Sequence, residues 1–294
     1  MVLFHRRIGI LSEGRRIFNY CAPAFRHMTD PSLALVVPAF NEAHRLGETL
    51  PLMIEYLSAH QPNAELIVVD DGSEDGTAEV SAANFADETR VVARVIRFEE
   101  NHGKGHAVRK GLLATRAPIA IFSDADLSTP ISELPKIVDP IRAGDYDVVF
   151  GSRALNRKLL GKRQPWRREY GGRIFNYFVR WGTGLPFFDT QCGFKAFRMN
   201  RYRPLLEQAA IDGFGFDVEL LFLARQAGLR LLECPVRWDH NEGSKVDLIR
   251  DSMRMLHDLG EIRRRFWSGQ YNSAISAAKS AAAVEGRSVT PTSF

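Results

Sequence analysis

Short apolar runs alternate with amphipathic stretches through the first half of the chain. Runs rich in β-branched residues predict buried strands at 33–37, 66–69, 91–98, 119–122 and 147–150. Apolar residues at helical spacing between the runs predict helices, among them 39–59 and about 132–143. Strands that alternate with helices build a mainly parallel sheet with covered faces. The pattern therefore predicts an α/β fold with a Rossmann-like sheet flanked by helices.

The run at 119–122 is followed by two carboxylates, Asp124 and Asp126. Residues two apart in extended chain point to the same side, and ligands of open α/β sheets sit at the carboxyl ends of strands. Two converging carboxylates repel each other unless a cation lies beside them. Mg²⁺ or Mn²⁺ that also holds a phosphate suits such oxygens. A loop of solvated aspartates is the alternative that this pair alone leaves open.

Polar residues also follow the earlier strands. Pro38 is expected to end the first strand, because proline donates no backbone hydrogen bond, and Asn41 is expected to cap the next helix. The second strand ends in acids, a turn glycine and candidate helix caps, namely Asp70, Asp71, Gly72, Ser73 and Asp75. A turn with a helix cap explains that stretch as well as a ligand site does.

A glycine-rich segment follows the third strand. Gly103 and Gly105 flank Lys104 where a helix begins. Backbone N–H groups, the helix dipole and an ammonium group can together hold phosphate. The Walker pattern is absent from the sequence, so this segment is a different kind of phosphate loop if it binds phosphate at all.

Composition adds a local charge imbalance. The 294 residues are 45% hydrophobic and 25% charged, as in ordinary globular proteins, and the net charge is +4. Between Arg153 and Arg173, eight Lys or Arg stand against one acid, which favours an anionic partner such as phosphates or a lipid surface. Cys21, Cys192 and Cys234 have neither metal-ligand nor disulfide spacing, which indicates a reducing compartment.

The two ends differ from the middle of the chain. No run reaches 18 apolar residues, so neither a transmembrane helix nor a signal peptide is expected. We expect a basic arm at 1–31, with Met28 as an alternative start, one domain at 32–267, and a flexible Ala- and Ser-rich tail at 268–294.

Five motifs in series resemble glycosyltransferase family 2, which has the GT-A fold. They are Val37-Pro-Ala-Phe-Asn-Glu42, Val69-Asp-Asp-Gly-Ser-Glu-Asp-Gly-Thr77, Asn101-His-Gly-Lys-Gly105, Asp124-Ala-Asp126 and Gly151-Ser-Arg153. Three later stretches are similar to the dolichyl-phosphate β-glucosyltransferase branch, namely Asp189-Thr-Gln-Cys-Gly-Phe-Lys-Ala-Phe197, Phe216-Asp-Val-Glu-Leu-Leu221 and Gly243-Ser-Lys245. The resemblance covers about 32–266 and leaves out both ends.

This resemblance implies a nucleotide-sugar donor, a divalent Mg²⁺ or Mn²⁺ ion and a polyprenyl-phosphate acceptor. By position, the donor-binding residues would be Pro38, Asn41, Glu42, Asp70, Asp71, Gly72, Gly103, Lys104, Asp124 and Asp126. Asp124 and Asp126 would hold the metal and the donor diphosphate. Ser128 stands where the related mannose synthases tend to carry a further metal-side Gln.

The chemistry needs positive charge more than a base. The metal stabilises the leaving diphosphate, and a phosphate monoester with a second pKa near ~6 is mostly anionic at pH 7. Arg153 and Lys245 are the candidates for the acceptor phosphate, ahead of a basic group comprising Arg167, Arg168 and Arg173.

Asp189 has more than one possible role. It could act as a base for a hydroxyl acceptor, orient Arg153 or Lys245, or cap a turn, and we favour orientation. Cys192 is expected to pack rather than react. Asp217 and Glu219 could be buried near the site or lie on an exposed helix face.

A lipid acceptor requires contact with a membrane. The aromatic and basic mixture of 170–188 and the amphipathic stretch 252–267 fit an interfacial position, although packing on the main domain explains 170–188 equally well. We therefore expect a cytoplasmic protein attached peripherally to the membrane.

The sequence thus predicts a metal-dependent inverting glycosyltransferase that moves a hexose, favouring glucose from UDP-glucose, to a polyprenyl phosphate. One alternative uses another nucleotide sugar, such as GDP-mannose, or a hydroxyl acceptor on a polysaccharide or glycolipid. A second is an inactive nucleotide-sugar-binding scaffold. Nucleic acid is not expected as a partner, because no recognised nucleic-acid motif accompanies the basic residues.

Overall fold

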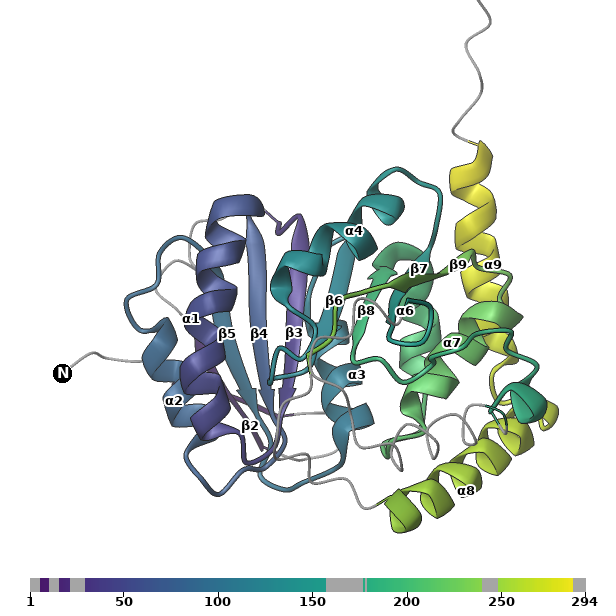
Figure 1. Cartoon of the computed structure of the whole chain (residues 1–294), viewed down its shortest axis with the longest axis horizontal. Coiled ribbons are helices and arrows are strands. Elements are labelled where there is room, and N and C mark those ends of the chain that lie inside the picture. Colours follow the sequence, from purple (N-terminus) through teal and green to yellow (C-terminus); the bar gives the residue numbers. More distant parts are fainter. Residues whose placement is uncertain are drawn as a thin grey trace, which may run out of the picture.

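The computed structural model describes residues 6–10, 16–21, 30–156, 177, 179–239 and 248–287, with side chains described from residue 30 on except at 248–253 and beyond 283. In these ranges nine strands form one sheet in the order β1-β2-β5-β4-β3-β6-β8-β7-β9 (Figure 1). The prediction of an α/β protein with helices flanking a mostly parallel sheet is confirmed.

The first half of the sheet follows the alternation in the sequence. Its elements are β1 (Arg6–Ile10), β2 (Arg16–Cys21), β3 (Leu33–Ala39), α1 (Ala43–His60), β4 (Ala64–Asp70), α2 (Thr77–Phe85), β5 (Val92–Arg97), α3 (Lys104–Ala114) and β6 (Ile119–Ser123). Strands β3, β4, β5 and β6 run parallel, whereas the β1–β2 hairpin joins β5 antiparallel.

The second half contains the antiparallel strand. Its elements are the 3₁₀ turn η2 (Ile131–Glu133), α4 (Leu134–Arg142), β7 (Val148–Ser152), β8 (Phe194–Arg198), α6 (Met199–Gln208), α7 (Phe216–Gln226), β9 (Leu231–Pro235), α8 (Leu248–Trp267) and α9 (Asn272–Arg287). Strand β8 lies between β6 and β7 and is antiparallel to both, while β7 and β9 are parallel.

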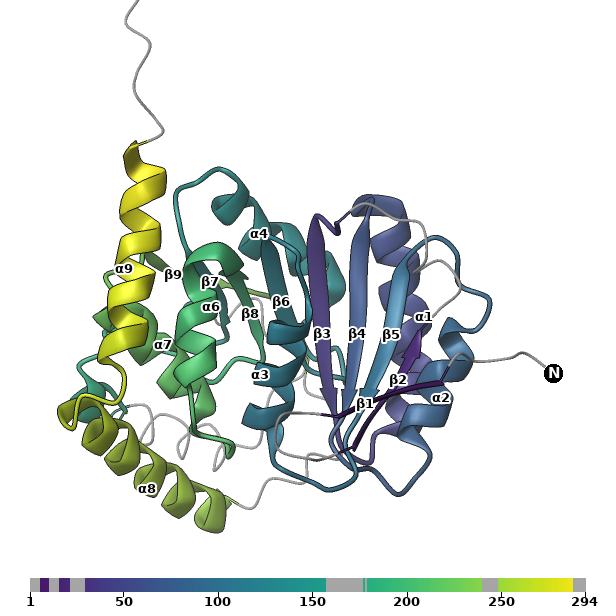
Figure 2. The same cartoon turned by 180° about the vertical axis from the view of Figure 1, so that it is seen from behind.

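Two apolar layers hold the helices onto the sheet. Because side chains alternate along a strand, Leu33, Leu35 and Val37 of β3 enter the core under α1, α2 and α4. Ala34 and Val36 enter the core on the opposite face, where α3 and α6 lie (Figure 2). Helices α7, α8 and α9 continue the same apolar core, with α9 against α6 and α8 against α7. Burial on both faces explains why these strands read as continuous apolar runs.

Local expectations were wrong at the start of α1. Strand β3 continues to Ala39, so Pro38 lies inside it, paired with Val69. Glu42, and not Asn41, is the N-cap residue, and its side chain makes no capping hydrogen bond. Asn41 instead has a positive φ of 53°, and its side chain accepts a hydrogen bond from the N–H of Glu74.

The ends of the chain are more structured than the sequence indicates. The expected basic arm contains the hairpin of β1 and β2. The expected flexible tail contains α9, where Tyr271, Ala274 and Ala278 are buried, so the prediction of a mobile segment from residue 268 was wrong for 268–287. The limits of the central domain stay a prediction.

The topology brings the candidate residues to one edge of the sheet. The carboxyl ends of β3, β4, β5, β6, β7 and β9 lie together, because all six strands point the same way. Antiparallel β8 contributes its beginning to the same edge. The loops after Ala39, Asp70, Ser123 and Ser152 and the segment before Phe194 are therefore neighbours.

Candidate active site

Two loops at the carboxyl edge are joined by side chains that serve the N-terminus of α1. The N–H groups of Asn41, Glu42 and Ala43 donate to Ser73 Oγ, Thr77 Oγ1 and Asp75 Oδ2 at 2.9, 2.9 and 3.0 Å. These contacts satisfy donors that have no partner within the helix. Asp75 also accepts from the N–H of Thr77 at the start of α2. One acid therefore fixes both helix starts beside the expected donor pocket.

The paired aspartates after β4 are buried. Asp70 is fully buried, accepts from the N–H of Ser73 at 2.9 Å and lies 3.5 Å from Arg97 Nε. Asp71 accepts from the N–H groups of His102 and Gly103, the latter at 2.7 Å. Burial raises the pKa of both carboxyl groups more than these donors lower it. Asp71 therefore fixes the loop that leads into α3.

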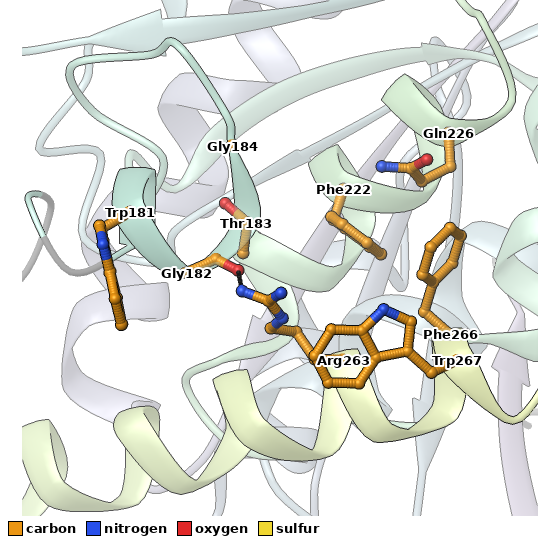
Figure 3. A pocket seen from close by; sticks show the side chains of 9 residues that line it. All are labelled: Trp181, Gly182, Thr183, Gly184, Phe222, Gln226, Arg263, Phe266 and Trp267. Atoms are coloured by element: carbon orange, nitrogen blue, oxygen red, sulfur yellow. Dashed lines mark hydrogen bonds between the residues drawn. The ribbon is translucent and has the colours of Figure 1, made fainter.

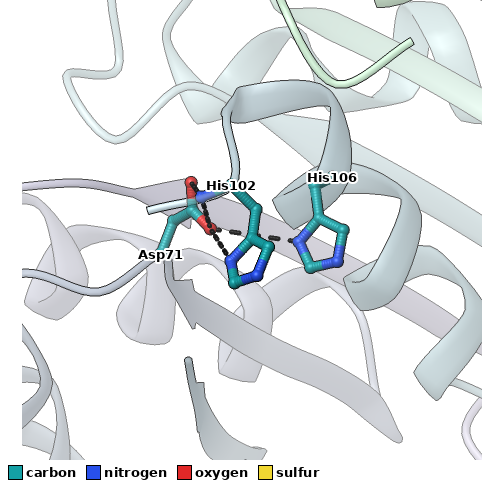
Figure 4. Close-up of side chains that lie close together, drawn as sticks. All are labelled: Asp71, His102 and His106. Carbon is teal, nitrogen blue, oxygen red and sulfur yellow. Dashed lines mark hydrogen bonds and ion pairs between the residues drawn. The ribbon is translucent and has the colours of Figure 1, made fainter. Parts of the chain in front are cut away.

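Asp71 also lies beside two histidines that the sequence argument passed over (Figure 4). Its Oδ1 is 3.9 Å from Nδ1 of both His102 and His106, and the three ligand atoms lie within 4.8 Å of one another. The two rings stack at 4.6 Å, and His102 Nδ1 is 2.7 Å from the carbonyl oxygen of Glu100. Oxygen and imidazole ligands suit a transition metal, but stacked rings place their nitrogens side by side rather than around a common point.

The expected metal ligands lie on the turn after β6. Asp124 and Asp126 are both half-buried, and Asp126 accepts from the N–H of Ser128 at 2.9 Å. A Cβ at Gly193 would stand 2.0 Å from Asp124 Oδ2, so the start of β8 needs glycine to leave room for this carboxylate. Two partly exposed carboxylates fit a hard divalent ion that takes its remaining ligands from phosphate oxygens.

Lys104 joins the glycine-rich loop to this carboxylate pair. Its Nζ lies 2.5 Å from Asp124 Oδ1. The preceding residue, Gly103, has a φ of 104° and approaches the backbone of Asp212, which explains the glycine before α3. Pro38 is buried within β3, whereas the other expected donor residues lie in the connections that follow β3, β4 and β5, namely Asn41, Glu42, Gly72 and Gly103.

Arg153 and Asp189 form a two-pronged ion pair at the end of β7. Asp189 accepts from the backbone N–H, Nε and Nη2 of Arg153 at 2.9, 2.6 and 2.8 Å. Despite its burial, the Arg153 charge holds the pKa of Asp189 below its usual value. Glu233 of β9 accepts from the N–H groups of Phe188 and Asp189 and from Ser152 Oγ, so it supports both sides of the pair. No local motif marks Glu233 in the sequence.

Three side chains near the site are buried, namely those of Glu219, Asp217 and Cys192. Glu219 is fully buried and accepts from Tyr271 Oη at 2.6 Å. Asp217 pairs with the fully buried Lys195 at 2.6 Å. Cys192 is buried, and burial raises the pKa of its thiol to about 12, which agrees with the expectation that it packs rather than reacts.

Some candidates cannot be placed. Lys245 and the basic group Arg167, Arg168 and Arg173 lie outside the described residues. Trp238 is an additional neighbour of the site, since the guanidinium of Arg153 lies 5.8 Å from the centre of its ring. The N–H of Asp239 donates to Ser128 O at 2.8 Å and so joins this segment to the aspartate turn.

A pocket of about 300 Å³ lies away from the carboxylates, between the helical end at 181–184, α7 and α8 (Figure 3). Arg263 donates to Gly182 O at 2.7 Å and lies over the ring of Trp267. Trp181 and Trp267 are 78% and 70% exposed. Within the described residues, no helix is long and apolar enough to cross a bilayer.

The carboxyl edge of the sheet thus gathers the carboxylates of Asp124 and Asp126, the ammonium of Lys104 and the Arg153–Asp189 pair. Residues 34–204 match the sequence profile of Glycosyl transferase family 2. The chain belongs to this family and is a glycosyltransferase.

Its similarity within the family is narrower. It is 32% identical over 249 residues to the dolichyl-phosphate beta-glucosyltransferase of Dictyostelium discoideum, which covers 81% of this chain and 75% of the relative. The human dolichyl-phosphate beta-glucosyltransferase is 31% identical over 252 residues, 81% of this chain and 77% of the relative. The resemblance to this branch is therefore confirmed.

The fold has solved counterparts. Glucosyl-3-phosphoglycerate synthase from Mycobacterium tuberculosis, crystallised with Mn²⁺, UDP and glucosyl-3-phosphoglycerate, superposes with a TM-score of 0.57. The two sequences are 22% identical, and the match covers 79% of this chain and 80% of the other. The protein has the GT-A fold, as expected.

Proposed function

We propose that this glycosyltransferase moves glucose from UDP-glucose to a polyprenyl phosphate in an inverting, metal-dependent reaction. The observation that carries the proposal is the placement of Asp124, Asp126, Lys104 and Arg153 at one edge of the sheet. Cations and a carboxylate pair are what two phosphate-bearing substrates require. The names of the relatives supply the sugar, the β linkage and the lipid acceptor.

The donor half of the site is assigned to the loops after β3, β4, β5 and β6. Asn41, Glu42 and Asp71 would line the nucleotide pocket, with Asp70 beneath it. Asp124 and Asp126 would hold Mg²⁺ or Mn²⁺. Bound there, the ion stabilises the charge that grows on the leaving diphosphate. A relative in fold has been crystallised with Mn²⁺ and UDP-glucose, which supports this choice of ion and donor.

The acceptor half is assigned to Arg153. Its side chain is held by Asp189 through two hydrogen bonds, which leaves the guanidinium oriented at little entropic cost when a phosphate arrives. The acceptor oxygen is mostly anionic at neutral pH, so no base needs to remove a proton from it. A carboxyl group whose pKa is lowered by an arginine also accepts protons poorly. Asp189 is therefore proposed to position Arg153.

The surface near the acceptor half supports a lipid substrate. Met255 of α8 contacts the side-chain amide of Gln191, two residues beyond Asp189. Asp258 of α8 accepts from the N–H of Gly215, close to the start of α3. Helix α8 thus borders the site, and its end carries the exposed Trp267, which lines the same pocket as the exposed Trp181. Exposed tryptophans and arginines are typical of a membrane-interface surface, so we propose peripheral attachment there.

Replacement of Asp189 by asparagine tests the phosphate acceptor against the hydroxyl alternative. We expect Asp189→Asn to raise the acceptor KM about ten- to a hundredfold while kcat changes much less, because a neutral amide holds Arg153 weakly. Asp189→Glu should recover part of the loss, and Asp139→Asn on the exposed surface of α4 should have no effect.

The hydroxyl alternative makes the opposite prediction for Asp189→Asn. If Asp189 removes a proton, kcat falls by orders of magnitude at an unchanged acceptor KM, with folding and UDP binding intact. Steady-state kinetics with varied acceptor separate the two outcomes.

A further inference from the structure

A row of alternating charges runs inward from the proposed metal site. It begins at Asp126 and Asp124 on the turn after β6, continues through Lys104 of α3, and ends at Asp217 of α7 and Lys195 of β8. Lys104 interacts electrostatically with all three acids of the row. The lysine therefore belongs to the same electrostatic unit as the carboxylates expected to bind the ion.

The inner pair of this row is fixed. Lys195 is fully buried, and its Nζ donates to Asp217 Oδ1 and to the carbonyl oxygen of Cys192, both at 2.6 Å. Moving the Lys195 ammonium group away from these partners would leave a buried charge without a counterion, which is strongly destabilising. Lys195 therefore has no route to the substrates, and Asp217 already has its counterion.

The outer pair, unlike the inner one, is partly exposed to solvent. The side chains of Lys104 and Asp124 are 29% and 36% exposed, and Lys104 Nζ lies 2.5 Å from Asp124 Oδ1. Within this pair the ammonium group of Lys104 balances the charge of the Asp124 carboxylate. A divalent ion that approaches Asp124 alone thus meets an oxygen already paired with an ammonium group.

The donor changes this balance. A lysine displaced from Asp124 remains at the first residue of α3, where the positive end of the helix dipole also attracts a diphosphate. The diphosphate then replaces Asp124 as the partner of the ammonium, and the carboxylate becomes available to the ion. When ion and donor bind together, both Lys104 and Asp124 have a partner of opposite charge. When the ion binds alone, Lys104 loses the carboxylate that was its partner.

We propose that Lys104 couples metal binding to donor binding: it holds Asp124 until a nucleoside diphosphate takes over its ammonium group. The coupling rests on the metal and donor sites of the proposed function. It assigns Lys104 a role beyond contact with phosphate, because the lysine lowers the affinity for the ion alone and raises it for the ion with donor. Coupling of this kind is typically 5- to about 150-fold.

The test is Mn²⁺ binding measured from the electron paramagnetic resonance signal of free Mn²⁺, with and without saturating UDP. In the wild type we expect weak binding of Mn²⁺ alone and a Kd at least about fivefold lower with UDP. Lys104→Met should bind Mn²⁺ alone at least about fivefold more tightly than the wild type. Its UDP effect should be smaller, and Lys104→Arg should restore part of it.

Two controls separate this effect from others. Lys110→Met removes the same charge from α3 away from the carboxylates and should bind Mn²⁺ like the wild type. Asp124→Ala should abolish the binding. If Asp124→Ala binds Mn²⁺ normally, the proposed metal site fails and the coupling with it. If Asp124→Ala loses Mn²⁺ but Lys104→Met binds it no more tightly than the wild type, only the coupling is overturned.

Discussion

Each buried acid at the carboxyl edge has its own set of donors. Asp71 is held by backbone N–H groups, Asp189 by Arg153, and Asp217 by Lys195. Buried carboxylates are stable only with such partners. Asp124 and Asp126 differ because they remain half-exposed on a turn. The buried acids therefore hold loops and side chains in place, whereas the partly exposed acids are suited to bind an ion.

His106 gives the site a pH-dependent stability. Burial, and then the neighbouring His102, lowers the pKa of His106 from 6.5 to about 4. Its unfolded form takes up a proton near 6.5, so the stabilisation by neutral His106 is complete above that pH and is lost as the pH falls towards 4. The loss for this residue is at most about 3 kcal/mol. Urea unfolding at pH 7.5 and pH 4.5 measures it.

Substitution isolates that contribution. In His106→Gln, the free energy of unfolding should decrease less between pH 7.5 and pH 4.5 than in the wild type. This difference is independent of the stability of the variant at pH 7.5. His44→Gln, at an exposed histidine of α1, should leave the fall unchanged. An equally steep fall in His106→Gln would show that His106 is not its source.

Sequence patterns locate these residues but not their partners. Asp124, Asp126 and Arg153 could be predicted because each follows an apolar run that ends at the same edge of the sheet. The Asp189–Arg153 pair was one of several open roles. Glu233 and the Asp71–histidine contact were missed, because they depend on how distant strands and loops meet.

Helix α9 shows that a sequence pattern can also miss a whole helix. Its composition of Ala and Ser, with few large apolar residues, led to the prediction of a flexible tail. Tyr271, the residue before this helix, is buried and donates to the buried Glu219 of α7. Glu219 also accepts from the N–H groups of Ala210 and Ile211. Small side chains let α9 lie close to α6, a contact that a hydrophobicity pattern does not register. Strand β8 was likewise seen only as a motif.

Removal of one hydroxyl tests this anchor. Tyr271→Phe should lower the free energy of unfolding by about 1.5–3 kcal/mol, because a buried carboxylate loses a donor. Ser280→Ala, on the exposed side of α9, should change it by less than about 0.5 kcal/mol. Chemical denaturation gives both values. Equal stabilities would mean that the Tyr271–Glu219 hydrogen bond does not hold α9 in place.

For the whole molecule, the fold places the active edge and the proposed membrane surface close together. Helix α8, which Figure 1 shows below α7, contacts the segments around Gln191 and Gly215. It ends at Trp267, whose side chain is exposed. A lipid phosphate could thus reach Arg153 while its chain stays in the bilayer.

Flotation with vesicles tests this surface. The wild type should float with vesicles that contain anionic lipid and less at high salt, because tryptophans and arginines act together. Trp181→Ser with Trp267→Ser should reduce the floating fraction severalfold. Leu52→Ser, at an exposed apolar residue of α1, should not. No flotation of the wild type with any vesicle would contradict peripheral attachment through this surface.

The most direct test of the proposed function is the transfer of labelled glucose from UDP-glucose to polyprenyl phosphate in detergent with Mn²⁺. We expect a lipid product that contains β-linked glucosyl phosphate and that a chelator abolishes. Asp124→Ala with Asp126→Ala should lower its rate at least about 100-fold. Polyprenol without phosphate should not react. If UDP binds but no UDP- or GDP-hexose yields a lipid phosphate product, or if polyprenol reacts as well, the proposed acceptor is wrong.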